Sequence, residues 1–449
     1  MSIEDQALPA QPKAKAPLIS RIRAAFSRVP MLGWLLGAMA AVLIERIFGY
    51  FLARLLGLSN VPTIFGVTII FSNPALIPSA LIYTILVYVL PISLLALLTV
   101  PLTNRVAAWL LRLPMWLTGI FYVALLYVDL AIWAGISDYR VLLARLIMIA
   151  IITTLSLNVV NGYMGEFSCS HPGFMALGAY GASVITVLLF SPNNVFGITL
   201  LPASLAPLFF PLALIAGGLL AAFGALFVAI PSFRTRGDYL AIISLAFTFI
   251  VKSLIENLEI VGGARGFMGQ PNVASLLVVF IWTVASILII NNFVRSTLGK
   301  ALNAVRDDET AADAMTVNTR HTKMVAFLFS AFWAGVAGGL LAHVLRYVNP
   351  GSFGVLKLSE VLAMVYLGGL NSVVGSLVGA IGLNFLMEAL RPLEILKWIV
   401  IPVLLILVMI FRPTGLIAFR EFKVENLIRP RDKSKVVPTE EVEHAVVGD

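Results

Sequence analysis

One polar stretch inside the chain, GKALNAVRDDETAADAMTVNTRHTK at residues 299–323, carries the residue types with which this protein could act on a partner. Charged side chains alternate there with alanines that favour helix, and Leu302 and Val305 begin an apolar strip at a spacing of three. A short charged helix of this kind can dock into a groove on a soluble partner, and a solvated helix without a partner has the same pattern. The residues that we assign to docking are Gly299, Ala301, Leu302, Val305, Arg306, Asp307, Asp308, Glu309 and Ala312.

The sequence lacks several motifs that are usual in enzyme active sites. The phosphate-binding pattern G-x-x-x-x-G-K-[ST] does not occur, nor do H-E-x-x-H and G-x-S-x-G, and neither His321 nor His343 has a partner at metal-ligand spacing. The single cysteine, Cys169, excludes an intramolecular disulfide. We therefore expect no enzymatic activity, no metal and no cofactor bound by this chain.

The composition places the polar stretch in a membrane protein. Of the 449 residues, 60% are hydrophobic and only 12% are charged, with a mean hydropathy of +0.97. A soluble domain carries about a quarter charged residues, because its water-facing surface needs them. The net charge of +8 does not indicate a nucleic-acid partner, because the basic residues lie between and beyond apolar runs rather than on one soluble face.

We expect an all-α, polytopic integral membrane protein with about 10–12 transmembrane helices, because a span needs about 20 apolar residues and must satisfy its own backbone groups. Residues 1–30 are polar and basic and lack a cleavage site, so they are expected to form a tail before the first span. The expected spans lie at 31–52, 80–100, 116–134, 141–160, 172–190, 206–230, 239–257, 273–292, 323–343, 358–371, 374–391 and 396–411.

The distribution of basic residues orients the chain. With both termini in the cytoplasm, the inside segments hold roughly three times as many Lys and Arg residues as the outside segments. The loop at 293–322 and the tail after 411 are both basic, so the chain must cross the membrane an even number of times between them. This requirement favours two short helices in 358–391, separated at Gly368-Gly369-Leu370-Asn371-Ser372, over one continuous helix with a glycine kink.

Non-helical backbone at membrane depth is tolerated only where protein or a water-filled cavity covers it. Gly368, Gly369 and Asn371 are therefore candidates for a transport pathway. Glu166 and His171 flank the inner end of a span, where they either support the fold or line the same pathway.

Further intramembrane residues are expected to have structural roles. The motifs Gly335-x-x-x-Gly339 and Gly375-x-x-x-Gly379, the latter continued by Gly382, allow close helix packing. Asn158, Asn161, Ser244 and Asn384 suit interhelical hydrogen bonds. We expect Glu45 and Arg46 to pair locally or with another subunit, Asp129 to pair with a neighbouring helix, and Glu388 to pair with Arg391 one turn on.

Five stretches in the same order resemble the permeases of branched-chain amino acid ABC importers, and together they cover roughly residues 145–420. Besides the polar stretch they are LSLNVVNGYMGEFSCSHPGFMALGAYGAS (155–183), FRTRGDYLAIISLAF (233–247), YVNPGSFGVLKLSEVLAMVYLGGLNSVVGSLVGA (347–380) and ILVMIFRPTGLIAF (406–419). The resemblance implies an importer permease domain at 141–420, preceded by an N-terminal membrane extension at 31–140 as in the longer of two paired permeases, and followed by a cytoplasmic tail at 421–449. It also makes the polar stretch a cytoplasmic coupling helix, whereas Glu166 departs from the uncharged residue common in the family.

The resemblance further implies partners. These are a second permease subunit, two cytoplasmic ATP-binding subunits that use ATP and magnesium, and a periplasmic solute-binding protein, in a bacterial inner membrane. Importers of urea and other amides or of aromatic acids use similar permeases, so the substrate stays open. An ion-driven secondary transporter is a second alternative, for which the interrupted region 358–391 is the sole hint, and a membrane enzyme lacks a nucleophile or metal cluster.

Overall fold

The computed structural model describes residues 25–58, 61–62, 74–191, 200–233, 239–412 and 415–417. Residues 1–24 of the expected N-terminal tail, the expected C-terminal tail 421–449 and the loop residues Arg234 and Arg236 lie outside this set. The chain divides into two compact units: unit 1 takes in the described residues 25–52 and 82–129, and unit 2 takes in the described residues between 53 and 81 and between 130 and 417. The domain boundaries expected from the sequence remain a prediction.

Unit 1 is helical in its described part. It contains a core cluster of Leu32, Leu35, Leu110 and Tyr122. Buried Glu45 accepts hydrogen bonds from the hydroxyls of Tyr83, at 3.4 Å, and Tyr88. The helices of this part of the chain are α2 (Met31–Leu55), η2 (Pro74–Leu76), α4 (Ile77–Thr84), η3 (Ile85–Val89), α5 (Leu90–Leu98), α6 (Val100–Leu110) and α7 (Met115–Ala134).

Asp129, near the end of unit 1, departs from the expectation of a partner on a neighbouring helix. Its side chain is buried, and neither carboxylate oxygen has a hydrogen-bond partner among the described residues. The expected pair further along the chain is present, because Arg391 donates to Glu388 at 3.2 Å.

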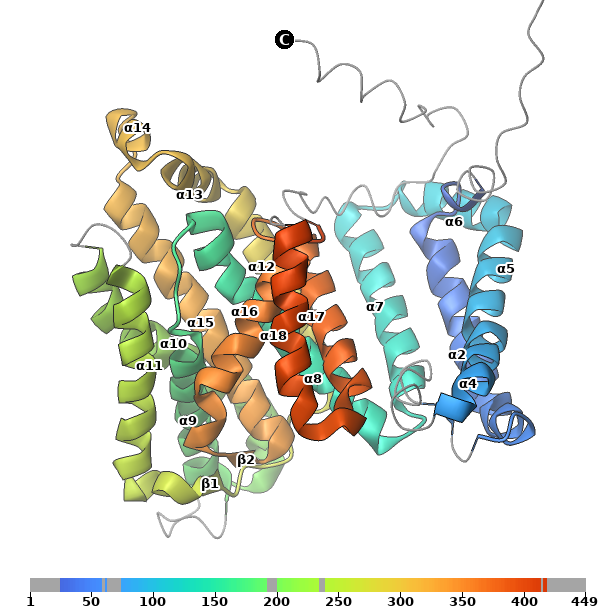
Figure 1. The fold of residues 1–449 in the computed structure, drawn as a ribbon, viewed down its shortest axis with the longest axis horizontal. Helices are drawn as coiled ribbons and strands as arrows, with labels where there is room; N and C mark the ends of the chain where they lie inside the picture. The colour runs from blue at the N-terminus through green and yellow to red at the C-terminus, as the bar shows by residue number, and fades with distance from the viewer. Residues whose placement is uncertain are drawn as a thin grey trace, which may run out of the picture. The chain divides into compact units, whose positions relative to one another are not determined.

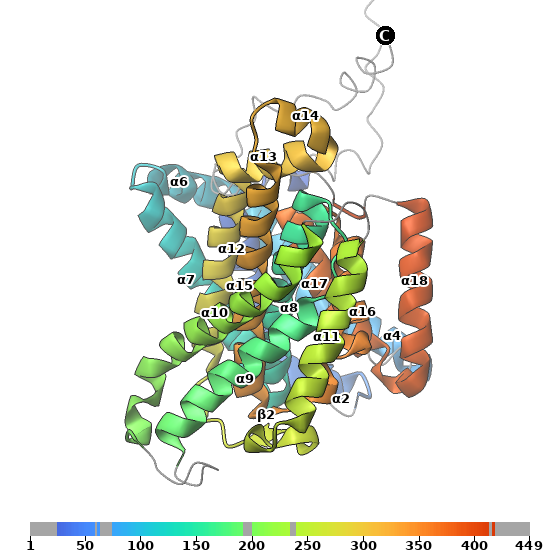
Figure 2. The ribbon, with the colours of Figure 1, turned by 90° about the vertical axis from the view of Figure 1, so that its left-hand side faces the viewer.

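Unit 2 surrounds one deeply buried helix, α8 (Asp138–Asn158), whose last two turns expose almost no side chain. Besides residues 53–81, which include η2 and most of α4, the unit contains the helices from α8 to α18 (Figures 1 and 2). Its further elements are η4 (Val159–Met164), α9 (His171–Phe190), η5 (Ala203–Leu205), α10 (Ala206–Ser232), α11 (Tyr239–Asn257), η6 (Glu259–Val261), η7 (Gly263–Arg265), β1 (Phe267–Met268), α12 (Leu276–Arg295), α13 (Thr297–Asp307), α14 (Glu309–Ala314), α15 (Thr319–Leu345), β2 (Tyr347–Val348), η8 (Pro350–Phe353), α16 (Val355–Gly368), α17 (Val373–Ala389), η9 (Arg391–Leu396) and α18 (Lys397–Phe411).

Glycines bring α9, α10 and α15 together. A Cβ atom on Gly178 would lie 2.1 Å from the carbonyl oxygen of Gly335, and one on Gly217 would lie 2.7 Å from the carbonyl oxygen of Gly178. Only glycine permits backbones to approach so closely, and small residues serve the same purpose in membrane helix bundles generally. Gly335 and Gly339 therefore have the packing role that their spacing predicts.

The helix inventory confirms the expected fold class. Among the described residues, nine helices are long and apolar enough to cross a membrane, and they occupy the first nine expected spans. The last three expected spans, at 358–371, 374–391 and 396–411, correspond to the shorter helices α16, α17 and α18. The described residues contain one small sheet, in which β1 and β2 pair antiparallel with Phe267 opposite Val348. This sheet lies at the end of unit 2 opposite to α13 and α14 (Figure 1).

The chain is interrupted between α16 and α17, so the alternative of a continuous kinked helix is wrong. The two helices run antiparallel, because Gly368 faces Gly375 while Gly379 faces the carbonyl oxygen of Met364. We call residues 369–372 the break. Gly382 does not continue this contact, because a Cβ atom there would meet nothing within 4 Å.

Candidate functional site

The polar stretch forms two helices instead of the single helix expected, and we call α13 and α14 together the coupling element. Asp308 separates them with an extended backbone, and its carboxylate caps α14 by accepting from the backbone N–H groups of Thr310 (2.9 Å) and Ala311 (3.0 Å). An aspartate that satisfies the free N–H groups of a first turn is a strong helix-starting signal. Its side chain therefore starts a new helix here.

One face of the coupling element is buried and the other is exposed. Gly299, Leu302, Val305 and Ala312 are buried, so the apolar strip faces the rest of unit 2. The side chain of Asp307 is 68% exposed, and Met315, directly after α14, is 77% exposed. Our sequence reasoning did not single out Met315; a large apolar residue next to a charged helix was the available signal.

Lys323 connects the coupling element to the loop after η4. Its ammonium group lies 2.8 Å from a carboxylate oxygen of Glu166 and 2.9 Å from one of Glu309. Lys323 is itself buried, near the start of α15. A cation between two carboxylates holds both in place, so Glu166, the departure from the family pattern, has its partner inside this chain.

Arg306 makes a second connection to the same loop. Its guanidinium donates to the carbonyl oxygen of Gly162 at 3.3 Å and to the carboxylate of Asp307 at 2.7 Å. Its aliphatic stem lies over Gly165, where a Cβ atom would be 2.3 Å from the Arg306 Cγ. Gly165 has a φ of 77°, a backbone conformation that favours glycine in any case.

The break is held by a side chain of α8. Asn158 donates to the carbonyl oxygen of Ser372 (3.0 Å) and to the hydroxyl of Ser376 (2.7 Å), and its side-chain oxygen accepts from the backbone N–H of Asn371 (3.1 Å). Non-helical backbone in a membrane needs such substitute partners. Asn158 thus makes the interhelical bonds that its type predicts, and Asn384 donates both to the carbonyl oxygen of Ala380 in its own helix (2.8 Å) and to the sulfur of Met364 on α16 (4.0 Å).

The C-terminal end of α16 is completed by a distant part of the chain. The backbone N–H groups of Leu416 and Ile417 donate to the carbonyl oxygens of Leu367 (3.0 Å) and Gly368 (2.9 Å). These carbonyl groups belong to the last turn of α16, where partners within the helix are missing. The segment after α18 therefore takes part in the break.

His171 and Glu166 have different partners, although both were expected at the inner end of one span. His171 is fully buried, and its Nε2 lies 3.0 Å from the hydroxyl of Ser330, which in turn donates to the carbonyl oxygen of Ser156. Because that hydroxyl proton is already used, Nε2 carries the hydrogen and donates. The Nδ1 atom of His171 and the side-chain oxygen of Asn371 are buried with no hydrogen-bond partner among the described residues.

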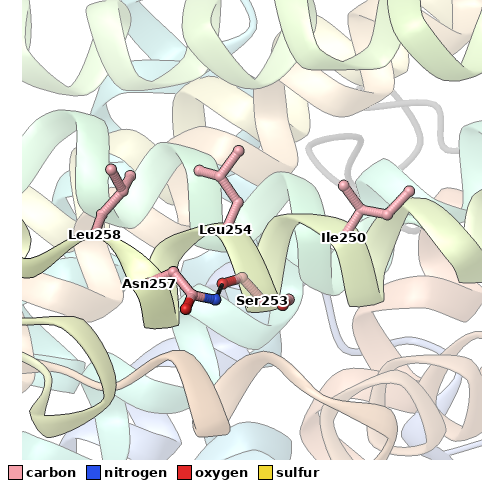
Figure 3. Close-up of a pocket in the computed structure, with 5 residues that line it drawn as sticks. All are labelled: Ile250, Ser253, Leu254, Asn257 and Leu258. Atoms are coloured by element: carbon pink, nitrogen blue, oxygen red, sulfur yellow. Dashed lines mark hydrogen bonds between the residues drawn. The ribbon is translucent and has the colours of Figure 1, made fainter.

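A hollow on α11 lies apart from these groups. It is lined by Ile250, Ser253, Leu254, Asn257 and Leu258 (Figure 3). The Asn257 side chain donates to the carbonyl oxygen of Ser253 at 2.7 Å, within the same helix. The lining is mostly apolar, and it includes none of the residues that hold the coupling element or the break.

Comparisons with known proteins agree with this architecture. The family described as "Branched-chain amino acid transport system / permease component" matches residues 139–410. The high-affinity branched-chain amino acid transport system permease protein LivM of Escherichia coli (strain K12) is 34% identical over 347 residues, which cover 68% of this chain and 77% of that protein. LivM of Salmonella typhimurium is 32% identical over 66% of this chain and 74% of its own length.

A shorter match is the high-affinity branched-chain amino acid transport system permease protein BraD of Pseudomonas aeruginosa. It is 32% identical over 126 residues, which cover 27% of this chain and 40% of BraD. No solved structure matches this chain.

Proposed function

Because this chain belongs to the family of permease components of branched-chain amino acid transport systems, we propose that it is the transmembrane permease subunit of an ATP-binding cassette importer for branched-chain or closely related amino acids. The observation that carries this proposal is the coupling element. It presents an exposed charged and apolar tip, and it is joined through Arg306 and Lys323 to the helices that hold the break. A permease driven by a separate ATPase needs an exposed tip on which the ATPase docks and a connection from that tip to the rest of the membrane domain.

The partners follow from the same proposal. Two cytoplasmic ATP-binding subunits hydrolyse ATP with magnesium and dock on the coupling element of this permease and of a second, companion permease. A periplasmic solute-binding protein delivers the amino acid at the opposite end of unit 2. The names of the relatives support branched-chain amino acids, and the comparisons lend no support to urea, amide or aromatic-acid import or to an ion-driven transporter.

The proposed location is a bacterial inner membrane, with both termini and the coupling element in the cytoplasm. The excess of basic residues in the loop at 293–322 and in the tail after 411 supports this orientation. Gly368 at the end of α16 and Gly369 and Asn371 in the break are proposed to border the path of the amino acid.

Docking of the ATPases is tested on the exposed tip of the coupling element. Asp313→Lys reverses a charge, and Met315→Glu places a new charge where the apolar side chain would enter the groove of the ATPase. Both side chains are exposed in the permease itself. We expect ATPase subunits to be lost on purification of the complex, with leucine uptake falling at least about tenfold. The matched control is Arg112→Glu, a charge reversal at an exposed residue of unit 1.

The substrate class is tested in the same cells. Uptake of labelled leucine should be inhibited by unlabelled isoleucine and valine and not by urea. ATPase subunits that stay bound to the Asp313→Lys, Met315→Glu permease would contradict the docking assignment, and leucine uptake that urea inhibits and isoleucine does not would contradict the substrate.

A further inference from the structure

We propose that the turn Gly162–Glu166 is the junction that joins the coupling element to the break, and that Gly162 and Lys323 are positioning residues for the coupling of ATP hydrolysis to transport. This inference rests on the proposed function. Gly162 and Lys323 touch neither the amino acid nor ATP in this account. They keep the distance between two moving parts fixed.

The turn Gly162–Glu166 can make contacts outside η4 because of the hydrogen-bond pattern at the end of this helix. This helix has wide, π-type turns, and the backbone N–H groups of both Gly165 and Glu166 donate to one carbonyl oxygen, that of Val160. The carbonyl group of Gly162 is therefore left for a partner outside the helix. Short π-helical turns often occur at functional sites.

The coupling element holds the turn at its two ends. Arg306 donates to the carbonyl oxygen of Gly162 and lies over Gly165, while Lys323 joins Glu166 at the end of the turn to Glu309 on α14. The first contact comes from α13 and the second reaches α14. A displacement of the coupling element must therefore pull on the turn or break two charged contacts.

The opposite side of the turn lies against the break. A Cβ atom on Gly162 would be 1.9 Å from the side-chain oxygen of Asn158 and 2.6 Å from the backbone nitrogen of Asn371. These same two atoms form the 3.1 Å hydrogen bond that fixes the break to α8. The Cα of Gly162 therefore rests directly on this bond, and the carbonyl group of the same residue is bound by the coupling element.

A purely structural role of Gly162 and Lys323 predicts a different experimental result from a role in transmitting movement. If the contacts at Gly162 and Lys323 only stabilise the fold, their loss lowers ATPase activity and transport in proportion. If they transmit movement, hydrolysis continues while transport fails. The amount of ATP hydrolysed per amino acid imported separates the two cases.

The experiment uses the assembled transporter in proteoliposomes, with the companion permease, both ATPase subunits and the binding protein. We expect Gly162→Ala to leave the ATPases bound and to raise the ATP hydrolysed per leucine imported by about fivefold or more. The matched control is Gly119→Ala, because a Cβ atom on Gly119 would meet nothing within 4 Å. The control should keep the wild-type ratio.

A second pair of variants avoids the crowding that alanine creates at Gly162. Lys323→Met removes the cation between Glu166 and Glu309 and should raise the same ratio, while Lys323→Arg should restore it to within about twofold of wild type. If the Gly162→Ala permease does not assemble with its partners, the comparison of Lys323→Met with Lys323→Arg tests the junction by itself. The control is Lys252→Met, which removes the partner of Glu256 in a half-exposed pair on α11.

The outcomes separate this inference from the proposed function. Bound ATPases with an unchanged ratio in the Lys323→Met transporter, or a proportional loss of hydrolysis and transport, would overturn the junction and leave the permease assignment intact. If the wild-type permease binds no ATPase subunit, the proposed function itself fails.

Discussion

The side-chain oxygen of Asn158 accepts the backbone N–H of Asn371 at 3.1 Å, across 213 residues of sequence. The amide group of the same asparagine donates to Ser372 and Ser376, so one side chain of α8 serves both the break and the first turn of α17. In a membrane, an unpaired backbone group costs several kcal/mol. The break is therefore a built feature of unit 2, held from the most buried helix.

Replacing Asn158 tests how much the break depends on it. Asn158→Ala removes three hydrogen bonds, and interhelical bonds in membranes contribute about 0.6 kcal/mol on average and about 1.7 kcal/mol at most. We expect a loss of about 2 kcal/mol, measured as a lower thermal unfolding midpoint of the detergent-solubilised protein. Asn257→Ala is the control, because the Asn257 side chain binds only within its own helix in the contacts described. Equal midpoints for the two variants would contradict the role of Asn158.

The contact between α16 and α17 predicts a difference between two glycines of one helix. A Cβ atom on Gly379 would lie 2.0 Å from the carbonyl oxygen of Met364, whereas Gly382 has open space. Overpacking of this kind typically costs about 1–3 kcal/mol, so Gly379→Ala should destabilise the protein. Gly382→Ala should be neutral or stabilise it by up to about 1 kcal/mol, because alanine favours helix. Unfolding midpoints in detergent measure both, and a stable Gly379→Ala protein would contradict the close approach.

The bond from Leu416 to α16 can be removed without changing α16. Leu416→Pro removes the backbone N–H that donates to the carbonyl oxygen of Leu367, leaving that carbonyl unsatisfied at a cost of about 1–3 kcal/mol. Leu416→Ala keeps the N–H and changes only a half-exposed side chain. We expect the proline variant alone to lose stability and leucine uptake. Equal stability and equal leucine uptake in the two variants would contradict a role for the backbone bond.

The orientation of unit 2 is testable with single cysteines. Cys169 is buried, and its replacement by alanine gives a cysteine-free background. A cysteine at Thr310, on the coupling element, should react with a membrane-impermeant maleimide in inverted vesicles and stay unlabelled in cells with a permeable outer membrane. A cysteine at Met268, 67% exposed on β1, should show the reverse pattern. Labelling of both from the same side would contradict the arrangement.

The sequence predicts the helices of this protein well, because long apolar runs leave few other structures in a membrane. The interruption at Gly368 and Gly369 was also predictable, since the charges on either side of 358–391 demand an even number of crossings. The patterns of charge and hydropathy do not predict which residue each polar side chain contacts in the folded protein. Lys323 and Glu166 lie 157 residues apart, and only the folded chain brings them together.

The two-helix form of the coupling element shows a different limit. Our single helix followed the alanines and the apolar strip and gave too little weight to Asp308, whose short carboxylate competes for backbone N–H groups. Asn158 and Asn384 show the same difficulty. Both are asparagines in apolar helices, but Asn158 donates to Ser372 and Ser376, whereas Asn384 donates to Ala380 in its own helix and to Met364 on α16.

The bonds from Leu416 and Ile417 to the end of α16 also set an order of events during synthesis. A ribosome delivers the chain from its N-terminus, so α16 and α17 enter the membrane before the residues that complete their connection have been made. The interrupted hairpin must wait, with two carbonyl groups unpaired, until α18 has been inserted and the next few residues have left the ribosome. Final assembly of unit 2 is therefore a late step that follows the insertion of α18.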